Sequence, residues 1–505
     1  MSMTMCESVP SPGIRRREMA CLRSTVFAAL GGIVASGAIG GACNSVHANA
    51  ECVEQGTWTT IGVGLNGEVR TVLTFDDGKG PATYVAGDFT LAGGVACNRI
   101  ARWDGHSWAP VGLGFNAMVH ALEVHDDGTG PTLYAAGEFT ASGPSPVLRI
   151  ARWSGTDWEP VGAGFNAPVL TLESTSHDEI SGLYAGGEFL QTGNIATPAI
   201  ARWDGSIWSS VGNGLQYAPA SEDTPIQTAA VFDMVVHDLD DGPRLVIGGR
   251  FSRSGDVDAI GIAQWNGKTI SSLGSFNLGE CYLDDYELLG SVKDLAVLEL
   301  DDGPTLMAAV NERLECGPEG CGCMGFGVTE RFRAAVWSGS GWTTVFQRAQ
   351  CTNPCICDLG SAFIFGISAL NGTRYLAATD SYDSTFCDGG GGNNYWRRMY
   401  VEQGQTFQVV EPELQGTLNS VGVFDRITAP PVLWISGPQG FAVLVCDDEC
   451  PADLDTDGSV GGDDLSMLLA GWGTRGSGVD GDIVPDGVVD GADLSALLSA
   501  WGACE

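Results

Sequence analysis

Aspartate and glycine recur at calcium-ligand spacing close to the C-terminal end of the sequence. The stretch "DLDTDGSVGGDD" begins at Asp453 and has aspartate at its first, third, fifth and twelfth positions and glycine at its sixth. Calcium takes about six to eight oxygen ligands from a tightly wound loop, and this spacing supplies them. We therefore predict a calcium site whose ligands are the side chains of Asp453, Asp455, Asp457 and Asp464 and the backbone carbonyl of Ser459.

A second copy of this loop follows 29 residues later and predicts a second calcium ion. Its third position is Val484, which has no side-chain oxygen, so we expect the second ion to bind more weakly. The alternative is an acidic surface followed by a short amphipathic helix, but such a surface has no reason to repeat ligand spacing. The predicted ligands are the side chains of Asp482, Asp486 and Asp493, the backbone carbonyl of Val488, and Asp490 acting through water.

Each loop leads into the same apolar pattern, which predicts a pair of helices. The run "DLSMLLAGWG" from Asp464 is answered by "DLSALLSAWG" from Asp493. Val460, at the eighth place of the first loop, is expected to point inward. The helices are expected to pack through their leucines, namely Leu465, Leu468 and Leu469 against Leu494, Leu497 and Leu498.

The duplicated loop and helix, about 52 residues in all, resemble a type I dockerin, the module through which cellulosomal enzymes bind a cohesin domain on a scaffold. The Trp-Gly ends, with Cys450 and Cys504 on either side, are similar to the dockerin-like anchors of many secreted planctomycete proteins. This resemblance implies calcium-dependent attachment to a cohesin-like or cell-envelope protein. It also places the partner-binding residues at Gly462, Asp463, Gly491 and Ala492, where the residue types differ from those of cellulosomal dockerins.

The N-terminal 50 residues have the pattern of a secretory signal peptide. Four arginines precede a run rich in alanine, glycine and valine, and Ala48-Asn49-Ala50 offers a small-residue cleavage site. We expect the general export route, with a twin-arginine route as the alternative. No later run reaches the length of about 18 apolar residues that a membrane span needs, so no membrane span is predicted. The predicted location is outside the cell, either free or attached to the cell surface.

Charge and cysteine content agree with an extracellular protein. Residues 1–50 contain four arginines and two glutamates, so removing them takes the formal charge from −37 to −37 − 4 + 2 = −39, which argues against nucleic acid as a partner. Thirteen of the 16 cysteines remain, and in an exported chain they predict disulfides with one thiol left over. A thiolate metal site is the less favoured alternative for the clusters at Cys316, Cys321 and Cys323 and at Cys351, Cys355 and Cys357.

Between leader and anchor the chain repeats a unit of four expected strands. "RIARWDGHSWAPVG", "RIARWSGTDWEPVG" and "AIARWDGSIWSSVG" place Trp103, Trp153 and Trp203 at intervals of 50. Alternating apolar residues and short glycine turns are typical of hairpins. More divergent copies bring the count to seven, which predicts an all-β, seven-bladed β-propeller followed by the small all-α calcium-binding domain. Six or eight blades remain alternatives.

A lone partial repeat at 53–62, "VEQGTWTTIG", is expected to complete the last blade. The predicted domains are therefore 1–50 for the signal peptide, 51–446 for the propeller and 447–505 for the anchor. The residue pattern of the repeats resembles that of the propellers of fungal cortical landmark proteins and, more distantly, of kelch proteins. That resemblance implies an extracellular interaction scaffold, with a glycan or protein bound on the propeller face.

The repeat region contains little that indicates catalysis. The sequence has no nucleophile elbow, phosphate loop or zinc-protease motif. Asp88, Glu138 and Glu188 occupy the same place in successive units and are interpreted as a repeated structural position. The alternative is a ring of acids that binds a cation or a sugar. The prediction is a noncatalytic display module. The alternative is a polysaccharide hydrolase or lyase with its site in the divergent segments at 276–290 and 384–400.

Overall fold

The computed structural model describes most of the chain from residue 57 onward. Described are 57–60, 64–105, 107–217, 228–239, 242–274, 291–300, 303–316, 327–352, the strands between 364 and 445, and 454, 459–474, 481, 488–499 and 501–503. Side chains are described up to 346, apart from 57–60, 299–300, 312–316 and 327–332, and again in most of the C-terminal part. The predicted signal peptide at 1–50 lies outside these residues.

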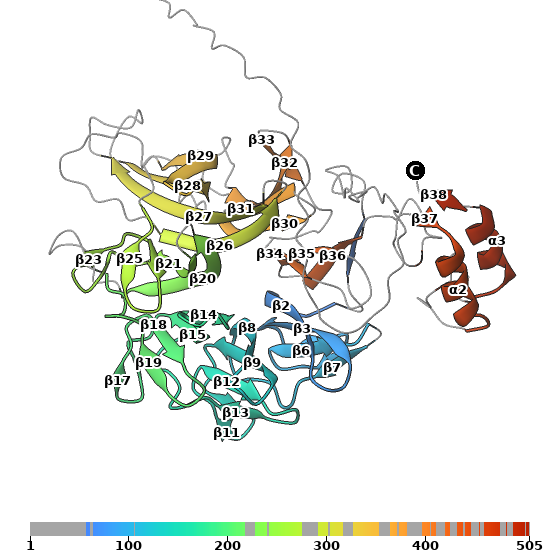
Figure 1. Cartoon of the computed structure of the whole chain (residues 1–505), viewed down its shortest axis with the longest axis horizontal. Helices are drawn as coiled ribbons and strands as arrows, with labels where there is room; N and C mark the ends of the chain where they lie inside the picture. Colours follow the sequence, from blue (N-terminus) through green and yellow to red (C-terminus); the bar gives the residue numbers. More distant parts are fainter. Residues whose placement is uncertain are drawn as a thin grey trace, which may run out of the picture. The chain divides into compact units, whose positions relative to one another are not determined.

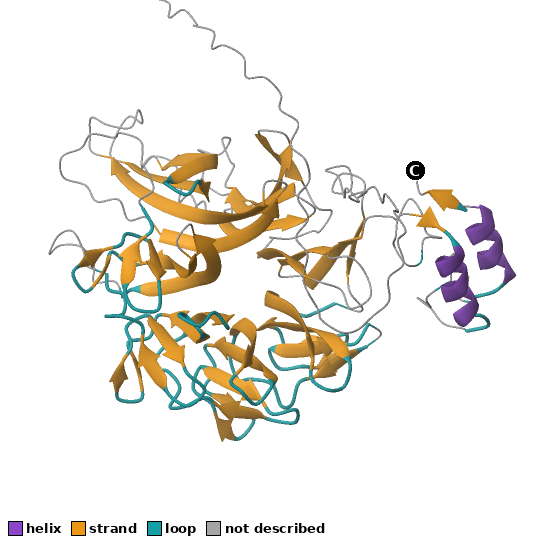
Figure 2. Ribbon diagram, in the orientation of Figure 1, coloured by secondary structure: helices purple, strands orange, loops and turns teal. Residues whose placement is uncertain are grey.

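The described chain is mostly β, with seven four-stranded antiparallel sheets and two helices (Figures 1 and 2). The first four sheets are β2 (Glu68–Asp76), β3 (Pro81–Asp88), β6 (Ile100–Trp103) and β7 (Trp108–Pro110); β8 (Val119–Asp126), β9 (Pro131–Gly137), β12 (Ile150–Trp153) and β13 (Trp158–Pro160); β14 (Val169–Thr175), β15 (Gly182–Gly187), β18 (Ile200–Trp203) and β19 (Trp208–Ser210); and β20 (Ala230–Leu239), β21 (Gly242–Arg250), β24 (Ile262–Trp265) and β25 (Ile270–Ser272). The four strands expected in each repeat are therefore present.

The remaining three sheets keep the same order of strands. They are β26 (Ser291–Leu300), β27 (Gly303–Cys316), β28 (Gly327–Trp337) and β29 (Trp342–Thr352); β30 (Ile364–Leu370), β31 (Thr373–Asp380), β32 (Trp396–Gln403) and β33 (Thr406–Val410); and β34 (Ser420–Phe424), β35 (Val432–Gly437), β36 (Gly440–Val445) and β1 (Thr57–Thr60). In the last sheet β1 pairs antiparallel with β36, with Thr57 opposite Val445. The N-terminal strand thus joins the sheet formed by residues 420–445.

Small hairpins interrupt the first four sheets between their second and third strands. They are β4 (Leu91–Ala92) with β5 (Val95–Ala96), β10 (Ala141–Ser142) with β11 (Ser145–Pro146), β16 (Gln191–Thr192) with β17 (Ile195–Ala196), and β22 (Arg253–Ser254) with β23 (Val257–Asp258). In each hairpin a backbone hydrogen bond joins the residue after its second strand to the residue before its first, for example from the amide of Cys97 to the carbonyl of Thr90 at 2.9 Å.

Asp-Gly turns close the first hairpin of the repeats, as the sequence predicts. In the first sheet the Oδ1 atom of Asp76 accepts hydrogen bonds from the amides of Gly78 at 2.8 Å and Gly80 at 3.0 Å. Gly78 has φ of +88°, which a residue without a side chain adopts at little cost. Asp126 makes the same two bonds in the second sheet, and the corresponding Asp240 and Asp301 lie outside the described residues.

First strands of neighbouring sheets contact each other in chain order. β2 contacts β8, β8 contacts β14, β14 contacts β20, β20 contacts β26, β26 contacts β30, and β30 contacts β34. β34 in turn contacts β2.

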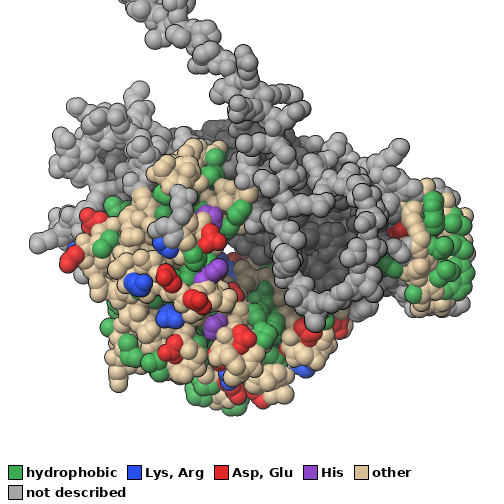
Figure 3. Space-filling model, viewed as in Figure 1, with side chains coloured by type: hydrophobic (Ala, Val, Ile, Leu, Met, Phe, Trp, Pro, Cys, Tyr) green, Lys and Arg blue, Asp and Glu red, His purple; other side chains and the backbone are tan. Residues whose placement is uncertain are grey.

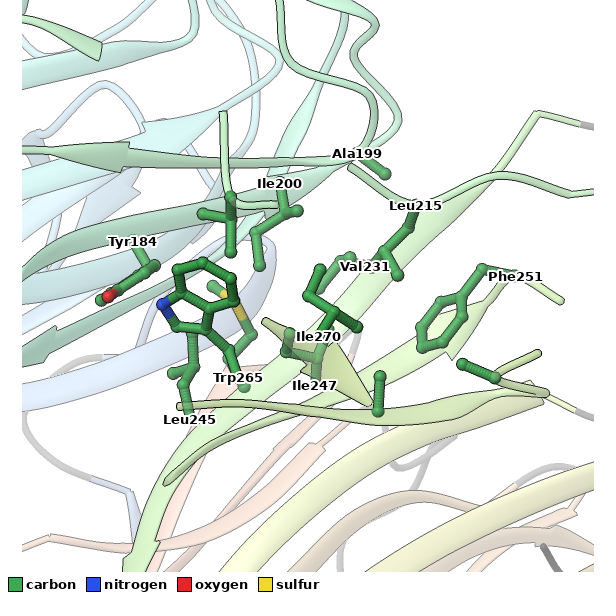
Figure 4. Packing of buried hydrophobic residues seen from close by; sticks show 14 of the residues in the cluster. Tyr184, Ala199, Ile200, Leu215, Val231, Leu245, Ile247, Phe251, Trp265 and Ile270 are labelled. Atoms are coloured by element: carbon green, nitrogen blue, oxygen red, sulfur yellow. The ribbon is translucent and has the colours of Figure 1, made fainter. Parts of the chain in front are cut away.

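Apolar side chains from consecutive sheets form the core. Figure 4 shows one such cluster, in which Tyr184 and Ile200 of the third sheet face Leu245, Ile247 and Trp265 of the fourth. Burial of such aromatic and branched side chains supplies most of the favourable free energy of folding. The repeated tryptophans belong to these clusters, with exposures between 2% and 8% for the set Trp108, Trp153, Trp158, Trp203, Trp208 and Trp265. They are packing residues, as interpreted from the sequence, and not a flat surface for sugars.

Helices α2 (Gly462–Ala470) and α3 (Gly491–Ser499) contact each other in the C-terminal part. β37 (Ser459–Val460), before α2, pairs antiparallel with β38 (Gly502–Ala503), after α3. No helix among the described residues combines the length and the apolar character that crossing a bilayer requires.

Candidate functional site

The two C-terminal helices share a small core whose members come in pairs 29 residues apart. Val460 and Val489, which precede the helices, and Leu468 and Leu497, which lie on them, are at most 1% exposed. Leu465 and Leu494 pack against this core as a half-buried pair. The expected inward position of Val460 and the expected packing of four of the six leucines are therefore observed.

Leu469 and Leu498 do not join this core, which corrects the sequence prediction. Their side chains are 53% and 54% exposed. On α2 the inward face is centred on Asp464 and Leu468, one helical turn apart, and Leu469 lies about 100° further around the helix axis. The leucine pair in each copy thus places one side chain inward and one outward.

An exposed apolar pair therefore occurs once in each copy. Leu469 lies three residues before Trp472, which is 46% exposed, and Leu498 lies three residues before Trp501, which is 50% exposed. Trp472 and Trp501 each lie two residues beyond the end of their helix, so each pair belongs to the C-terminal end of a helix. Figure 3 shows hydrophobic side chains gathered on the surface of the α2 and α3 part. We call Leu469, Trp472, Leu498 and Trp501 the apolar face.

Asp464, the predicted twelfth residue of the first calcium loop, lies buried at 1% exposure. Its Oδ1 accepts a hydrogen bond from the amide of Leu454 and its Oδ2 accepts one from the amide of Gly461, each at 2.6 Å. One carboxylate therefore ties the beginning of the loop to its end. Carboxylate oxygens have further lone pairs, so these bonds are compatible with a cation inside the loop.

Asp493 holds the equivalent position in the second copy and is fully buried. Its Oδ2 accepts a hydrogen bond from the amide of Asp490 at 2.7 Å. Asp490 itself is exposed, and its Oδ1 accepts a hydrogen bond from the amide of Ala492 at 2.8 Å, so it caps the start of α3. Buried carboxylates at both loop ends, in a segment rich in further aspartates, form a donor set suited to a hard cation such as calcium.

The other predicted ligands are only partly described. Asp453, Asp455, Asp457, Asp482 and Asp486 lie outside the described residues, and of Ser459 only the backbone, in β37, is described. Val488 is half-buried beside Val489. Within the part of the chain that the structure describes, no group of three potential metal-binding side chains is assembled.

The predicted partner positions lie in the first turns of the helices. Gly462, Gly491 and Ala492 are exposed, and the side chain of Asp463 lies outside the described residues. Val460, before α2, pairs with Gly502, after α3, and the amide of Gly473, after α2, donates to the carbonyl of Val489, before α3. The start of each helix therefore lies beside the C-terminal end of the other helix, next to one exposed Leu-Trp pair.

On the sheets, the acids at the ends of the second strands are each engaged with a basic residue. Asp88 pairs with Arg99 at 2.8 Å, Glu138 with His120 at 3.2 Å, and Glu188 with Arg250 at 3.6 Å. None of these partners is adjacent in sequence to its acid, so the repeat did not predict the pairs. The side chain of Asp380, at the same place of a later unit, is not described.

Three acids inside the first strands were missed from the sequence. Glu123 on β8, Glu173 on β14 and Asp233 on β20 are held among surrounding strands, and burial raises the pKa of Glu123 to about 8 and that of Asp233 to about 6. Burial, followed by the charges of Glu123 and Asp233, also raises the pKa of Glu173. The sequence feature that could have identified these acids is a charged residue within a predicted strand of alternating apolar residues.

Two of these acids, Glu173 and Asp233, connect neighbouring sheets. The Oε1 of Glu173 accepts a hydrogen bond from the amide of Val236 on β20 at 3.0 Å, and the Oδ2 of Asp233 accepts one from the amide of Leu295 on β26 at 2.8 Å. A side-chain acceptor thus replaces the strand partner that a backbone amide at a sheet edge lacks. A structural role accounts for them.

Of the histidines, His125 is buried and lies at the end of β8, where its Nδ1 is 2.8 Å from the hydroxyl of Ser174. His237 also lies within a strand, β20. Cys97 is a buried free thiol, and burial raises its pKa. The two cysteine clusters and the divergent segments at 276–290 and 384–400 are outside the residues with described side chains.

Comparison with known proteins adds no assignment. No family model matches this chain, and no curated protein matches it either.

Proposed function

We propose that this protein is a secreted, noncatalytic display module that is attached to a surface or scaffold through its C-terminal pair of helices. The observation that carries the proposal is the duplication of the apolar face, because Leu469 and Trp472 recur as Leu498 and Trp501 with similar exposure. Large apolar side chains exposed as a repeated set are typical of protein-binding surfaces. In this proposal the partner is a cohesin-like or cell-envelope protein.

The body that is displayed is, in our proposal, a seven-bladed β-propeller. Three observations support it: seven sheets of four strands, contacts between the first strands in chain order with β34 returning to β2, and the pairing of β1 with β36. A closed ring leaves few free sheet edges, which keeps an extracellular protein from aggregating.

Calcium is proposed to hold the two loops that precede α2 and α3. Asp453, Asp455, Asp457, Ser459 and Asp464 would hold the first ion, and the second copy a weaker one. When bound, the ions neutralise a dense group of carboxylates and fix the loop conformation. The chain's own contribution is Asp464, which already links the loop ends through the amides of Leu454 and Gly461.

Calorimetry on the full chain tests the calcium proposal. Asp457→Ala is expected to weaken the tighter site by about tenfold or more, whereas Asp486→Ala affects only the weaker one. Thr456→Ala, at a position of the same loop that is not a predicted ligand, serves as the control. An absence of binding at millimolar calcium would remove this part of the proposal.

Co-sedimentation with cell envelopes of the producing organism tests attachment. We expect binding in calcium that is lost in chelator and lost in the double variant Leu469→Ser, Trp472→Ser. Leu190→Ser, which changes a 50% exposed leucine on the sheets, is the matched control and should leave binding intact. Equal sedimentation of the unchanged protein and both variants would contradict the attachment role of the apolar face.

A further inference from the structure

A β-bulge occurs at the same place in the first strand of six sheets. In each, the pairing with the second strand skips one residue, as between Val69 and Thr71 in β2 or between Val292 and Asp294 in β26. Bulges redirect side chains and are common next to binding sites. The skipped residues with described side chains, which we call the bulge row, are Arg70, His120, Leu170, Phe232 and Lys293.

The bulge row gathers basic residues in a chain that has few of them. The whole sequence has 25 lysines and arginines against 62 acids, and only three of the 25 are lysines, at positions 79, 268 and 293. Lys79 and Lys268 are exposed beside turns, whereas Lys293 is half-buried within β26. Placing a scarce lysine in a partly buried strand position needs an explanation.

Two of the basic residues of the bulge row have an acid of their own. Arg70 pairs with Glu68 at 2.9 Å, and His120 pairs with Glu138 at 3.2 Å. Lys293 differs, because among the described residues no carboxylate lies in ion-pair contact with it. Its Nζ atom instead lies 3.8 Å from the centroid of the Phe232 ring.

A second cation lies against the same ring. The guanidinium carbon of Arg250 is 5.7 Å from the centroid of the Phe232 ring. The same guanidinium forms an ion pair with the carboxylate of Glu188, at 3.6 Å. Burial, and next the charge of Arg250, lower the pKa of Lys293 to about 8, while Glu188 acts in the opposite direction. One exposed carboxylate therefore faces two cations that repel each other in a partly desolvated place.

We propose that Lys293 and Arg250 form a binding site for an oxyanion, a carboxylate or sulfate group of a ligand that lies against Phe232. An oxyanion would supply the negative charge that this arrangement lacks. Guanidinium groups bind such anions through paired N–H donors, and the lysine ammonium adds a mobile point charge. The aromatic ring offers an apolar contact to the body of the ligand. This site goes beyond the attachment function and does not depend on it, because it lies on the sheets.

The three lysines make a specific measurement possible. Reductive methylation of the full-length protein with ¹³C-formaldehyde gives one dimethyl-lysine signal for each lysine, and Lys293→Arg assigns the signal of interest. Titration with sodium sulfate and, separately, with sodium glucuronate is expected to shift the Lys293 signal saturably. Sodium chloride at equal ionic strength should not, and the Lys79 and Lys268 signals should stay in place. Saturation by sulfate alone indicates a sulfated ligand, and saturation by glucuronate alone indicates a carboxylated one.

Variants complete the test. Arg250→Gln is expected to weaken anion binding by at least tenfold, and Arg250→Lys, which keeps the charge and loses the paired donors, should weaken it less. Arg253→Gln, a change at a nearby exposed arginine paired with Asp256, is the control. No saturable shift at Lys293 with either anion, equal shifts at all three lysines, or unchanged affinity in both Arg250 variants would overturn the proposal.

Discussion

The indole nitrogen of Trp158 donates a hydrogen bond to the backbone carbonyl of Val111, 3.0 Å away, across the boundary between the second and first sheets. The same bond joins Trp208 to Val161 at 3.1 Å and Trp342 to Leu273 at 2.8 Å. The second, third and fifth sheets are thus fastened to the sheet before them by a tryptophan at the start of their last strand, whereas the fourth sheet has Ile270 at that place. The regular interval between the repeated tryptophans in the sequence is therefore explained by a directional hydrogen bond as well as by apolar burial.

Removing this bond should destabilise the sheets measurably. Trp158→Phe keeps an aromatic ring but leaves the buried carbonyl of Val111 without its donor, so we expect a loss of about 1–3 kcal/mol in the free energy of unfolding. Urea denaturation followed by tryptophan fluorescence gives the value. Trp472→Phe, at an exposed tryptophan, is the matched control and should change it by less than about 0.5 kcal/mol.

A repeated left-handed backbone position gives a second test. Arg99, Arg149 and Ala199 have φ between 62° and 69°, and the same place in the fourth sheet is Gly261 with φ of 70°. The Ala199 side chain is a single methyl group buried in the core, and we expect the relief of backbone strain to outweigh the loss of that methyl group. Ala199→Gly should therefore stabilise the fold by about 0.5–1 kcal/mol. Ala201→Gly, two residues on and buried in β18, should destabilise it. A loss of stability in Ala199→Gly, measured by thermal unfolding, would contradict the assignment of strain.

The buried acid Glu123 predicts a pH dependence of stability. Its folded pKa of about 8 lies above the ordinary glutamate value, so the folded state keeps a proton that the unfolded state releases. This contribution is complete below the ordinary value and is lost as the pH rises toward about 8. Glu123→Gln should therefore raise the melting temperature by about 2 °C at pH 8.5 and leave it unchanged at pH 4. Glu159→Gln, at a half-exposed acid, should not alter the pH profile.

Loss of the N-terminal strand is expected to expose a sheet edge. Deleting residues 53–62 removes β1 and leaves the amides and carbonyls of β36 along that side without partners. We expect a lower melting temperature and concentration-dependent association in analytical ultracentrifugation. A monomeric truncated protein with an unchanged melting temperature would show that β1 does not contribute to the last sheet.

Repetition explains which features the sequence predicted. Trp103, Trp153 and Trp203 recur at a fixed interval, and a repeated unit must satisfy the same contacts each time, so strands, turns and packing tryptophans followed from the pattern. Leu469 was misplaced because a leucine pair on a short helix does not reveal which member faces the partner helix. Glu173 and Lys293 could not be interpreted, because their surroundings come from sheets about 60 or more residues away, and the bulge that orients Lys293 has no sequence signature.

If the protein is attached through its C-terminal helices as proposed, the position of β36 has a mechanical consequence. The chain leaves the sheets directly after Val445, and β36 lies between β35 and β1. A pulling force on the C-terminal helices would therefore load an interior strand, and both of its ladders would have to shear at once. An edge strand would peel away one hydrogen bond at a time under much smaller force. The strand contributed by the N-terminal part of the chain thus acts as a clamp on the point where the tether would pull.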